Sequence, residues 1–174
     1  MRRTSKTSCM NWTTVVLASC LMVVPSTAQE KNRDKDRAAV EASAFTSFEN
    51  VEAFVAVFKA AVRERSCFKV AALTELPLRL NCGRANALSA VRMRFVFNRT
   101  ALCRYFPEIF TEETSRVIEN QNLLDMPVGQ RGLMFGNGVI WLQPVCSARN
   151  SDGTCPDDKY KLRFTAANIT PSEK

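Results

Sequence analysis

The segment Arg131-Gly-Leu-Met-Phe-Gly-Asn-Gly-Val-Ile-Trp-Leu142 decides the fold that we expect for this chain. Two short apolar runs flank the dipeptide Asn137-Gly138. Asparagine followed by glycine readily adopts the positive backbone angles of a two-residue type I′ turn, so the segment predicts a β-hairpin. The run 160–164 then predicts a third antiparallel strand beside it.

Both strands of this hairpin are apolar on both faces. In the first strand Leu133 and Phe135 point one way and Met134 the other, and residues 139–142 of the second strand are all apolar. An antiparallel sheet with one face in water would instead alternate apolar and polar residues. We therefore expect helices to cover one face, and a cavity, a partner subunit or a ligand to cover the other.

The chain upstream of the hairpin predicts short helices and strands. Apolar residues three and four positions apart predict a helix that starts at the capping box Thr46-Ser-Phe-Glu49 and ends near Glu64. The other expected elements are a short helix from Cys67 that stops before Pro77, an edge strand at 78–80, a loop at 81–90, a half-buried strand at 91–97, a helix capped by Asn98 and broken by Pro107, and a helix capped by Thr111.

Residues 1–28 have the order of features found in a secretory signal peptide. Three cationic residues, an apolar stretch at 12–25 and the small residues Ser26 and Ala28 precede Gln29. The apolar stretch is too short and too interrupted to span a membrane comfortably. We predict a signal peptide at 1–28, a charged flexible leader at 29–44, a single α+β domain at 45–168, a tail at 169–174, and a periplasmic or secreted location.

A second cleavage pattern is present inside the same stretch. Leu17-Ala-Ser-Cys20 fits the site at which bacterial lipoproteins are cut and lipidated on the cysteine. The residues after Cys20 remain apolar, where a lipoprotein usually turns polar, so the lipid anchor is the less favoured alternative.

The charge of the exported part argues against nucleic-acid binding. Residues 1–28 carry three positive charges and no negative one, so their removal lowers the formal net charge from +7 to +4 (7 − 3 = 4). The basic face of a dedicated nucleic-acid binder normally dominates its charge balance.

Five cysteines follow the predicted signal peptide. No Cys-x-x-Cys pair and no histidine accompany them, which argues against a zinc site. Cys146 and Cys155 flank a turn-forming loop, and a disulfide there would be worth roughly 2.5 to 3 kcal/mol from chain entropy. Cys67 with Cys82 is a second, weaker candidate pair, which would leave Cys103 as a buried thiol.

Several strings resemble one family. Phe58-Lys-Ala-Ala-Val62, Leu76-Pro-Leu78, Tyr105-Phe-Pro-Glu-Ile-Phe110 and the hairpin together resemble small exported bacterial proteins with the NTF2-like, or cystatin-like, fold. The resemblance spans most of 45–166 and implies a cone: a curved antiparallel sheet packed with N-terminal helices. Within such a cone, the candidate ligand-binding residues are Phe58, Tyr105, Phe135 and Trp141.

The chain lacks the commonest catalytic groups. Without histidine there is no Ser-His or Cys-His pair, and we expect no cofactor and no metal. A non-enzymatic binding domain for an unknown protein or a small apolar ligand, with self-association as an option, is therefore the leading hypothesis. An enzyme of SnoaL-like type that uses a cavity carboxylate is the alternative, and its candidate carboxylates are Glu75, Glu108 and Asp125.

A third hypothesis rests on arginines that cluster in the sequence. Arg92 and Arg94 must share one face of their strand. A basic face could bind an acidic protein, as an inhibitor or immunity-like protein does. The candidate residues of this face are Arg79, Arg92, Arg94 and Arg99, with Arg84 and Arg104 near them in the sequence.

Overall fold

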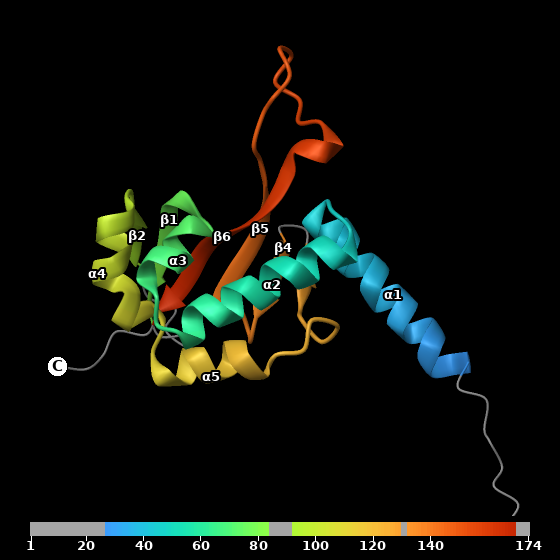
Figure 1. The fold of residues 1–174 in the computed structure, drawn as a ribbon, viewed down its shortest axis with the longest axis horizontal. Coiled ribbons are helices and arrows are strands. Elements are labelled where there is room, and N and C mark those ends of the chain that lie inside the picture. Colours follow the sequence, from blue (N-terminus) through green and yellow to red (C-terminus); the bar gives the residue numbers. More distant parts are fainter. Residues whose placement is uncertain (1–26, 84–91, 130–131, 170–174) are drawn as a thin grey trace, which may run out of the picture.

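The computed structural model describes residues 27–83, 92–129 and 132–169 (Figure 1). The signal peptide up to residue 26, with Cys20, lies outside the described residues, and so do Arg84, most of the loop expected at 81–90 and residues 170–174. The expectations for these segments therefore stay predictions.

The described part of the chain is an α+β structure, as predicted. Its helices are α1 (Thr27–Ala44), α2 (Phe48–Arg63), α3 (Cys67–Ala72), α4 (Arg99–Ile109) and α5 (Glu112–Asn120), with a short 3-10 helix at Asp157–Lys159. Its strands are β1 (Thr74–Cys82), β2 (Arg92–Val96), β3 (Val128–Gly129), β4 (Gly132–Phe135), β5 (Ile140–Cys146) and β6 (Tyr160–Ile169).

The described strands form one six-stranded sheet in the order β2-β1-β6-β5-β4-β3. The third strand predicted at 160–164 is confirmed, because β6 pairs antiparallel with β5 from Tyr160 onward. The prediction of an all-antiparallel sheet is wrong, because β6 also runs parallel to β1. β6 is long and apolar on its inner side, and its place between β1 and β5 buries Leu162 and Phe164 in the middle of the sheet.

One face of the sheet packs against the helices. α2 crosses this face in front of β6, β5 and β4 (Figure 1). Buried residues from all five described α-helices join one hydrophobic core with the inner residues of the strands. At its centre, the Phe58 ring of α2 lies 5.8 Å from the ring of Phe135 and 5.6 Å from that of Phe164.

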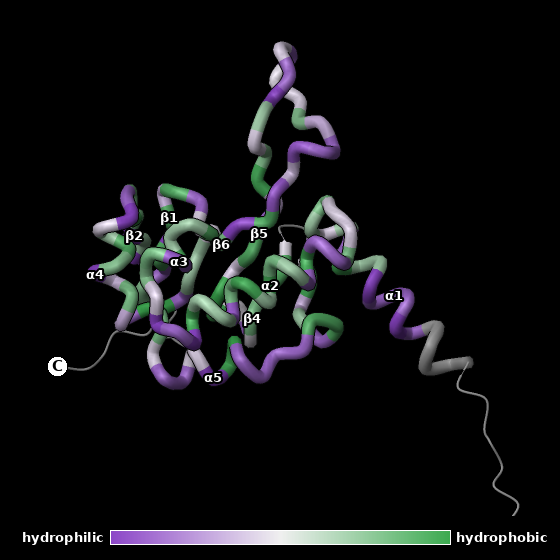
Figure 2. The backbone as a smooth tube through the Cα atoms, viewed as in Figure 1, coloured by the Kyte–Doolittle hydropathy of each residue, from purple (hydrophilic) through white to green (hydrophobic). Residues whose placement is uncertain are grey.

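A helix occupies the segment that we expected to be a flexible leader. Residues 32–37 of α1 are exposed and hydrophilic, and this part of the helix extends away from the body of the protein (Figure 2). Its last turns are anchored, because Val40 and Ala44 are buried in the core and Ser43 Oγ donates to the Gly129 carbonyl oxygen at 3.2 Å. The charge of 29–41 predicts a solvated segment, whereas the anchoring residues lie at its C-terminal end and just after it.

Three of the helices begin close to where the sequence places them. The N-caps Asn98 of α4 and Thr111 of α5 are confirmed, since each side chain accepts a hydrogen bond from a backbone N–H of its first turn. The cap of α2 is Ser47 and not Thr46, and the Ser47 hydroxyl accepts from the Asn50 N–H. The Thr46 hydroxyl instead accepts a hydrogen bond from the side-chain amide of Asn50.

Two prolines act differently from the expectation. Pro107 does not break α4, which continues to Ile109. α3 ends at Ala72, well before Pro77, and Pro77 lies inside β1, which is not an edge strand because it has neighbours on both sides. Proline fits there because pairing with β2 starts only at Leu78, and pairing with β6 is irregular between Thr74 and Arg79.

The hairpin is confirmed, but its turn type is wrong. The last paired residues are Phe135 and Ile140, so four residues connect β4 to β5. Gly136 and Gly138 have positive φ angles of 56° and 84°, whereas the φ angle of Asn137 is not positive. Because a type I′ turn needs two successive residues with positive φ, this turn is not of type I′.

Two disulfides are formed. The predicted Cys146–Cys155 bond is confirmed. The Cys67–Cys82 pairing is wrong, because Cys67 bonds to Cys103, with 5.1 Å between their Cα atoms, and Cys82 is free. The extended strand β1 carries Cys82 away from α3, whereas α3 and α4 contact each other. Chain entropy makes the longer Cys67–Cys103 loop worth about 4 kcal/mol, against about 2.5 kcal/mol for the shorter one.

This connectivity is directly testable. After the unreduced protein is unfolded in an alkylating agent and digested without reductant, mass spectrometry should find one peptide pair joined through Cys67 and Cys103 and another joined through Cys146 and Cys155. Cys82 should carry the alkyl group once the protein is unfolded, because it has no disulfide partner. A peptide pair joined through Cys67 and Cys82 would contradict the structure.

Candidate functional site

The aromatic residues expected to bind a ligand do not meet in one cavity. Phe58 and Phe135 are fully buried and stack within the core. Tyr105 lies half-buried on α4, and Trp141 lies half-buried on β5. Because Phe58 also contacts the rings of Phe110 and Phe164, phenylalanine side chains fill the space between α2 and the sheet.

The carboxylates considered for an enzyme lie outside this core. Glu108 and Asp125 are exposed, and Glu75 is half-buried on β1. Asp125 borders an open hollow of about 400 Å³ beside α5, whose other lining residues include Glu113, Arg116 and Gln121. The three carboxylates stand on separate elements, and this arrangement gives no support to a catalytic pair.

The sheet has a second face, which we call the outer sheet face. Side chains of paired residues on adjacent strands project to the same side. Leu78 and Leu80 of β1 are fully buried on the helix side, so Arg79 between them projects to the outer sheet face. Phe95 of β2 and Ala166 of β6 pair with Arg79 and project with it.

The arginines predicted to form one basic face are divided between two. Arg94 pairs with Leu80 and Arg92 pairs with Cys82, so both lie on the helix side of β2, one strand face as expected. Arg79 lies on the outer sheet face instead, and Arg99 is exposed at the start of α4. The four residues therefore surround β2 from both sides.

Apolar side chains are exposed at the same end of the sheet. Met93 and Phe95 of β2 project to the outer sheet face with exposed fractions of 62% and 50%, and Phe97, just after β2, is 71% exposed. The rings of Phe95 and Phe97 lie 6.4 Å apart. Together with Arg79, Arg92 and Arg94, these three residues form what we call the β2 surface.

Hydrogen bonds fix the middle of the outer sheet face beside this surface. The side-chain amide of Asn81 donates to Asn168 Oδ1 at 2.7 Å, and the amide of Asn168 donates to the Gly138 carbonyl oxygen at 2.6 Å. Trp141 Nε1 donates to the same carbonyl oxygen at 3.0 Å. These bonds hold the outward side chains of three strands in fixed positions, so the face is preorganised.

Arg79 is held in an unfavourable state. Its Nε atom is buried and has no hydrogen-bond partner among the described residues. A buried donor without a partner costs about 1–3 kcal/mol. A side chain that costs stability in this way is often retained for binding rather than for folding.

The arginines of the β2 surface also lack ion pairs with described carboxylates. Elsewhere, Arg63 pairs with Glu119 at 2.9 Å, and Arg116 pairs with Glu112 at 2.8 Å. Arg163 donates to the Ala72 carbonyl oxygen at 3.1 Å. The positive charge around β2 is therefore uncompensated by ion pairs within the described part of the chain, in contrast to that of Arg63 and Arg116.

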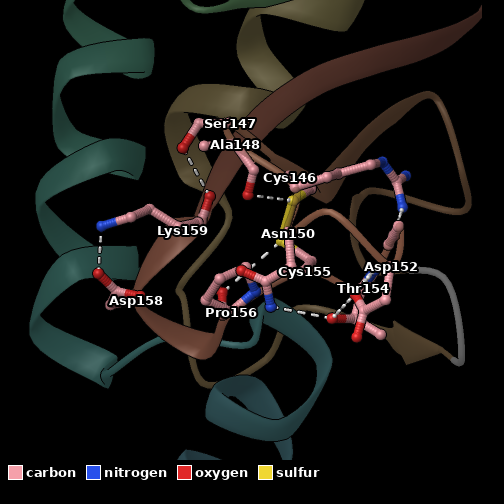
Figure 3. The surroundings of a disulfide bond; sticks show 12 residues. Cys146, Ser147, Ala148, Asn150, Asp152, Thr154, Cys155, Pro156, Asp158 and Lys159 are labelled. Atoms are coloured by element: carbon pink, nitrogen blue, oxygen red, sulfur yellow. Dashed lines mark hydrogen bonds and ion pairs between the residues drawn. A yellow bond between two sulfur atoms is a disulfide. The ribbon is translucent and has the colours of Figure 1, made fainter.

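A second exposed feature is the disulfide-closed loop between β5 and β6, which projects well beyond the sheet (Figure 1). Internal hydrogen bonds fix its conformation: the side-chain amide of Asn150 donates to the Thr154 hydroxyl oxygen at 2.9 Å (Figure 3), and Arg149 donates to the Gly153 carbonyl oxygen at 2.9 Å. Hydrogen bonds from the Thr154 side chain and backbone N–H lower the pKa of Asp152. Hydrogen bonds within the loop therefore stabilise its conformation.

Comparisons with known proteins give no relative for this chain. No protein-family model matches it, and neither the curated proteins nor the solved structures contain a significant match. Within the described ranges, no helix is both long and apolar enough to cross a membrane, and no three potential metal ligands are grouped together.

Sequence reasoning missed the exposed apolar residues of β2. The alternation in 91–97 predicts a half-buried strand, but only Val96 of β2 is buried. No sequence signal identifies this surface, because a half-buried strand with one solvated face shows the same alternation.

Replacing Arg79 tests whether it serves folding. In Arg79→Met the apolar stem stays and the unpaired donor disappears, so the free energy of unfolding should stay unchanged or rise by up to about 1 kcal/mol. Urea denaturation followed by circular dichroism measures the change. The matched control Arg163→Met removes a formed hydrogen bond and should lower stability by about 0.5–1.5 kcal/mol. A loss above about 1 kcal/mol in Arg79→Met would assign Arg79 a structural role.

Proposed function

We propose that this chain is an exported, non-enzymatic interaction domain that binds an acidic protein through the β2 surface. The observation that carries the proposal is the combination of three exposed apolar side chains, Met93, Phe95 and Phe97, with arginines that have no described ion-pair partner. Scattered exposed apolar residues need no explanation, whereas a contiguous apolar patch rimmed by charge marks an interaction site.

The chemistry of the surface favours a protein partner. Methionine, aromatic residues and arginine are the residue types enriched at protein–protein interfaces. Here the apolar side chains of β2 lie on the outer sheet face beside Arg79, and Arg92 and Arg94 supply positive charge on the opposite, helix side of the same strand. Guanidinium groups bind carboxylates in a two-pronged geometry, so the complementary partner carries aspartate or glutamate.

The interior supports this choice over a small apolar ligand. A ligand in the cone would need room beside Phe58, and that room is occupied by Phe110, Phe135 and Phe164. We also propose an NTF2-like cone for the fold, supported by N-terminal helices that pack on one face of the sheet. In this cone the concave side is filled, and the binding surface lies at the β2 end.

Export is part of the same proposal. The signal-peptide pattern at 1–28 supports it, and so do two disulfides, which form and persist in oxidising compartments. An interaction domain with this location meets partners in the periplasm or outside the cell.

The predicted cleavage can be measured on protein recovered from the exporting host. Intact mass and N-terminal sequencing should give a chain that starts at Gln29, because Ser26 and Ala28 stand at the positions that signal peptidase reads. A chain that starts at Cys20 with added acyl mass, and partitions into detergent, would favour the lipid-anchored alternative instead.

The β2 surface is tested with a matched pair of variants. The partner is first captured by crosslinking from the native host and purified, and its Kd for each variant is then measured by calorimetry. Phe95→Asp should weaken binding by about 30-fold or more, because it places a carboxylate in the apolar centre of the surface. The wild-type Kd should also rise steeply with salt, as an arginine-led interface requires.

Val57→Asp is the control for this measurement. Val57 is 55% exposed on α2, away from the outer sheet face, so the same chemical change there should leave the Kd unchanged. Circular dichroism confirms that both variants are folded. Equal Kd values for the two variants, or a Kd that salt does not affect, would overturn the proposed binding surface.

A further inference from the structure

We infer that the partner binds as an added strand: an extended segment of alternating acidic and apolar residues pairs with the edge of β2 that no described strand occupies. The inference rests on the proposed function and specifies the form of the partner.

The first support is the position of β2 in the sheet. β2 stands at one end of the strand order and pairs only with β1 among the described strands, from Leu78↔Val96 to Cys82↔Arg92. The backbone N–H and C=O groups that point away from β1 therefore have no strand partner in the described structure. Such groups are a template for another strand, and main-chain hydrogen bonds to a sheet edge provide affinity in this binding mode.

The second support is the division of side chains between the two faces of β2. Arg92 and Arg94 project on the helix side, and Met93 and Phe95 project to the outer sheet face. A strand added beside β2 projects its own side chains to these same two faces. Its complement is thus a segment with acidic residues at one set of alternate positions and apolar residues at the other.

The same pattern argues against a second copy of this chain as the added strand. In a symmetric antiparallel pair of β2 strands, a two-fold axis perpendicular to the sheet keeps like faces on the same side. In the registers centred on Met93 or Arg94, Arg94 then stands opposite Arg92 or Arg94 of the other copy. Like charges directly opposite each other destabilise a strand pair, so the edge disfavours these self-pairings and favours an acidic strand.

The test uses synthetic peptides and the folded protein with both disulfides intact. The probe is an acetylated and amidated peptide of about eight residues with alternating Glu and Val, which is long enough to cover a strand of this length. Two matched peptides keep its composition: one groups the Glu and Val residues into two blocks, and one carries N-methyl groups on alternate residues so that one edge cannot donate. Binding is measured by two-dimensional NMR, which detects millimolar affinities.

The alternating peptide should shift the amide signals of residues 92–96 and slow their hydrogen exchange. The peptide with Glu and Val in two separate blocks and the N-methylated peptide should both bind at least about tenfold more weakly.

The double variant Arg92→Glu/Arg94→Glu should no longer bind the Glu-Val peptide and should bind the corresponding Lys-Val peptide. The control Arg33→Glu/Lys35→Glu makes the same charge change on the exposed part of α1 and should keep the original preference.

Other outcomes separate this inference from the proposed function. Equal binding of the three peptides, without protection of 92–96, would overturn strand addition and leave an acidic partner for the β2 surface. No binding of any peptide would also overturn it, while the calorimetric comparison of Phe95→Asp and Val57→Asp still decides the proposed function. Tight binding to phosphatidylglycerol vesicles that Phe95→Asp abolishes would replace both with a lipid surface.

Discussion

The packing of the Phe58 ring against Phe110, Phe135 and Phe164 is the contact on which the rest of the structure depends. These four side chains come from α2, the end of α4, β4 and β6, and all are fully buried. Such aromatic pairs contribute about 0.5–1.5 kcal/mol each beyond the area that they bury. They fix α2 across the sheet and fill the space where a cone-shaped fold could hold a ligand. The core therefore decides indirectly where binding can occur, since it leaves the sheet edges and the outer sheet face.

Local signals predicted the parts of the fold that depend on neighbouring residues. The glycines around Asn137 indicated a hairpin, Asn98 and Thr111 indicated helix starts, and the turn-rich loop between Cys146 and Cys155 indicated a short disulfide. In each case the feature depends on backbone angles or bonds among a few neighbouring residues, so the local sequence is enough to predict it. The parallel pairing of β1 with β6 and the Cys67–Cys103 bond could not be derived in this way. Both depend on how distant elements pack, and short-range patterns do not record that.

The sequence predicts which arginines belong to the candidate site, but it does not predict on which face of the sheet each one lies. The arginines near β2 were identified from the sequence, whereas their division between the helix side and the outer sheet face requires the register of β1 and β2. Alternation in a strand shows that two faces differ without showing which one is buried. In β1 the apolar residues Leu78 and Leu80 are in the core, and in β2 the apolar residues Met93 and Phe95 are in solvent. Sequence reasoning treated both strands alike, and so missed the exposed side chains that support the proposed function.

The alternating arginines of the edge strand β2 can serve two purposes: protection from pairing with another copy of the chain, and recognition of an acidic strand. Charged side chains on an edge strand protect a protein from pairing with its own copies. At β2, this protection acts in the pairing registers that place Arg94 opposite Arg92 or Arg94 of another copy. The same two charges attract a strand that carries carboxylates at matching positions, so protection and recognition are one electrostatic property of the edge. The burial of Arg79 Nε without a described partner is not needed for protection, because Arg79 lies one strand inward on the outer sheet face. Its cost to stability is what favours recognition over protection alone.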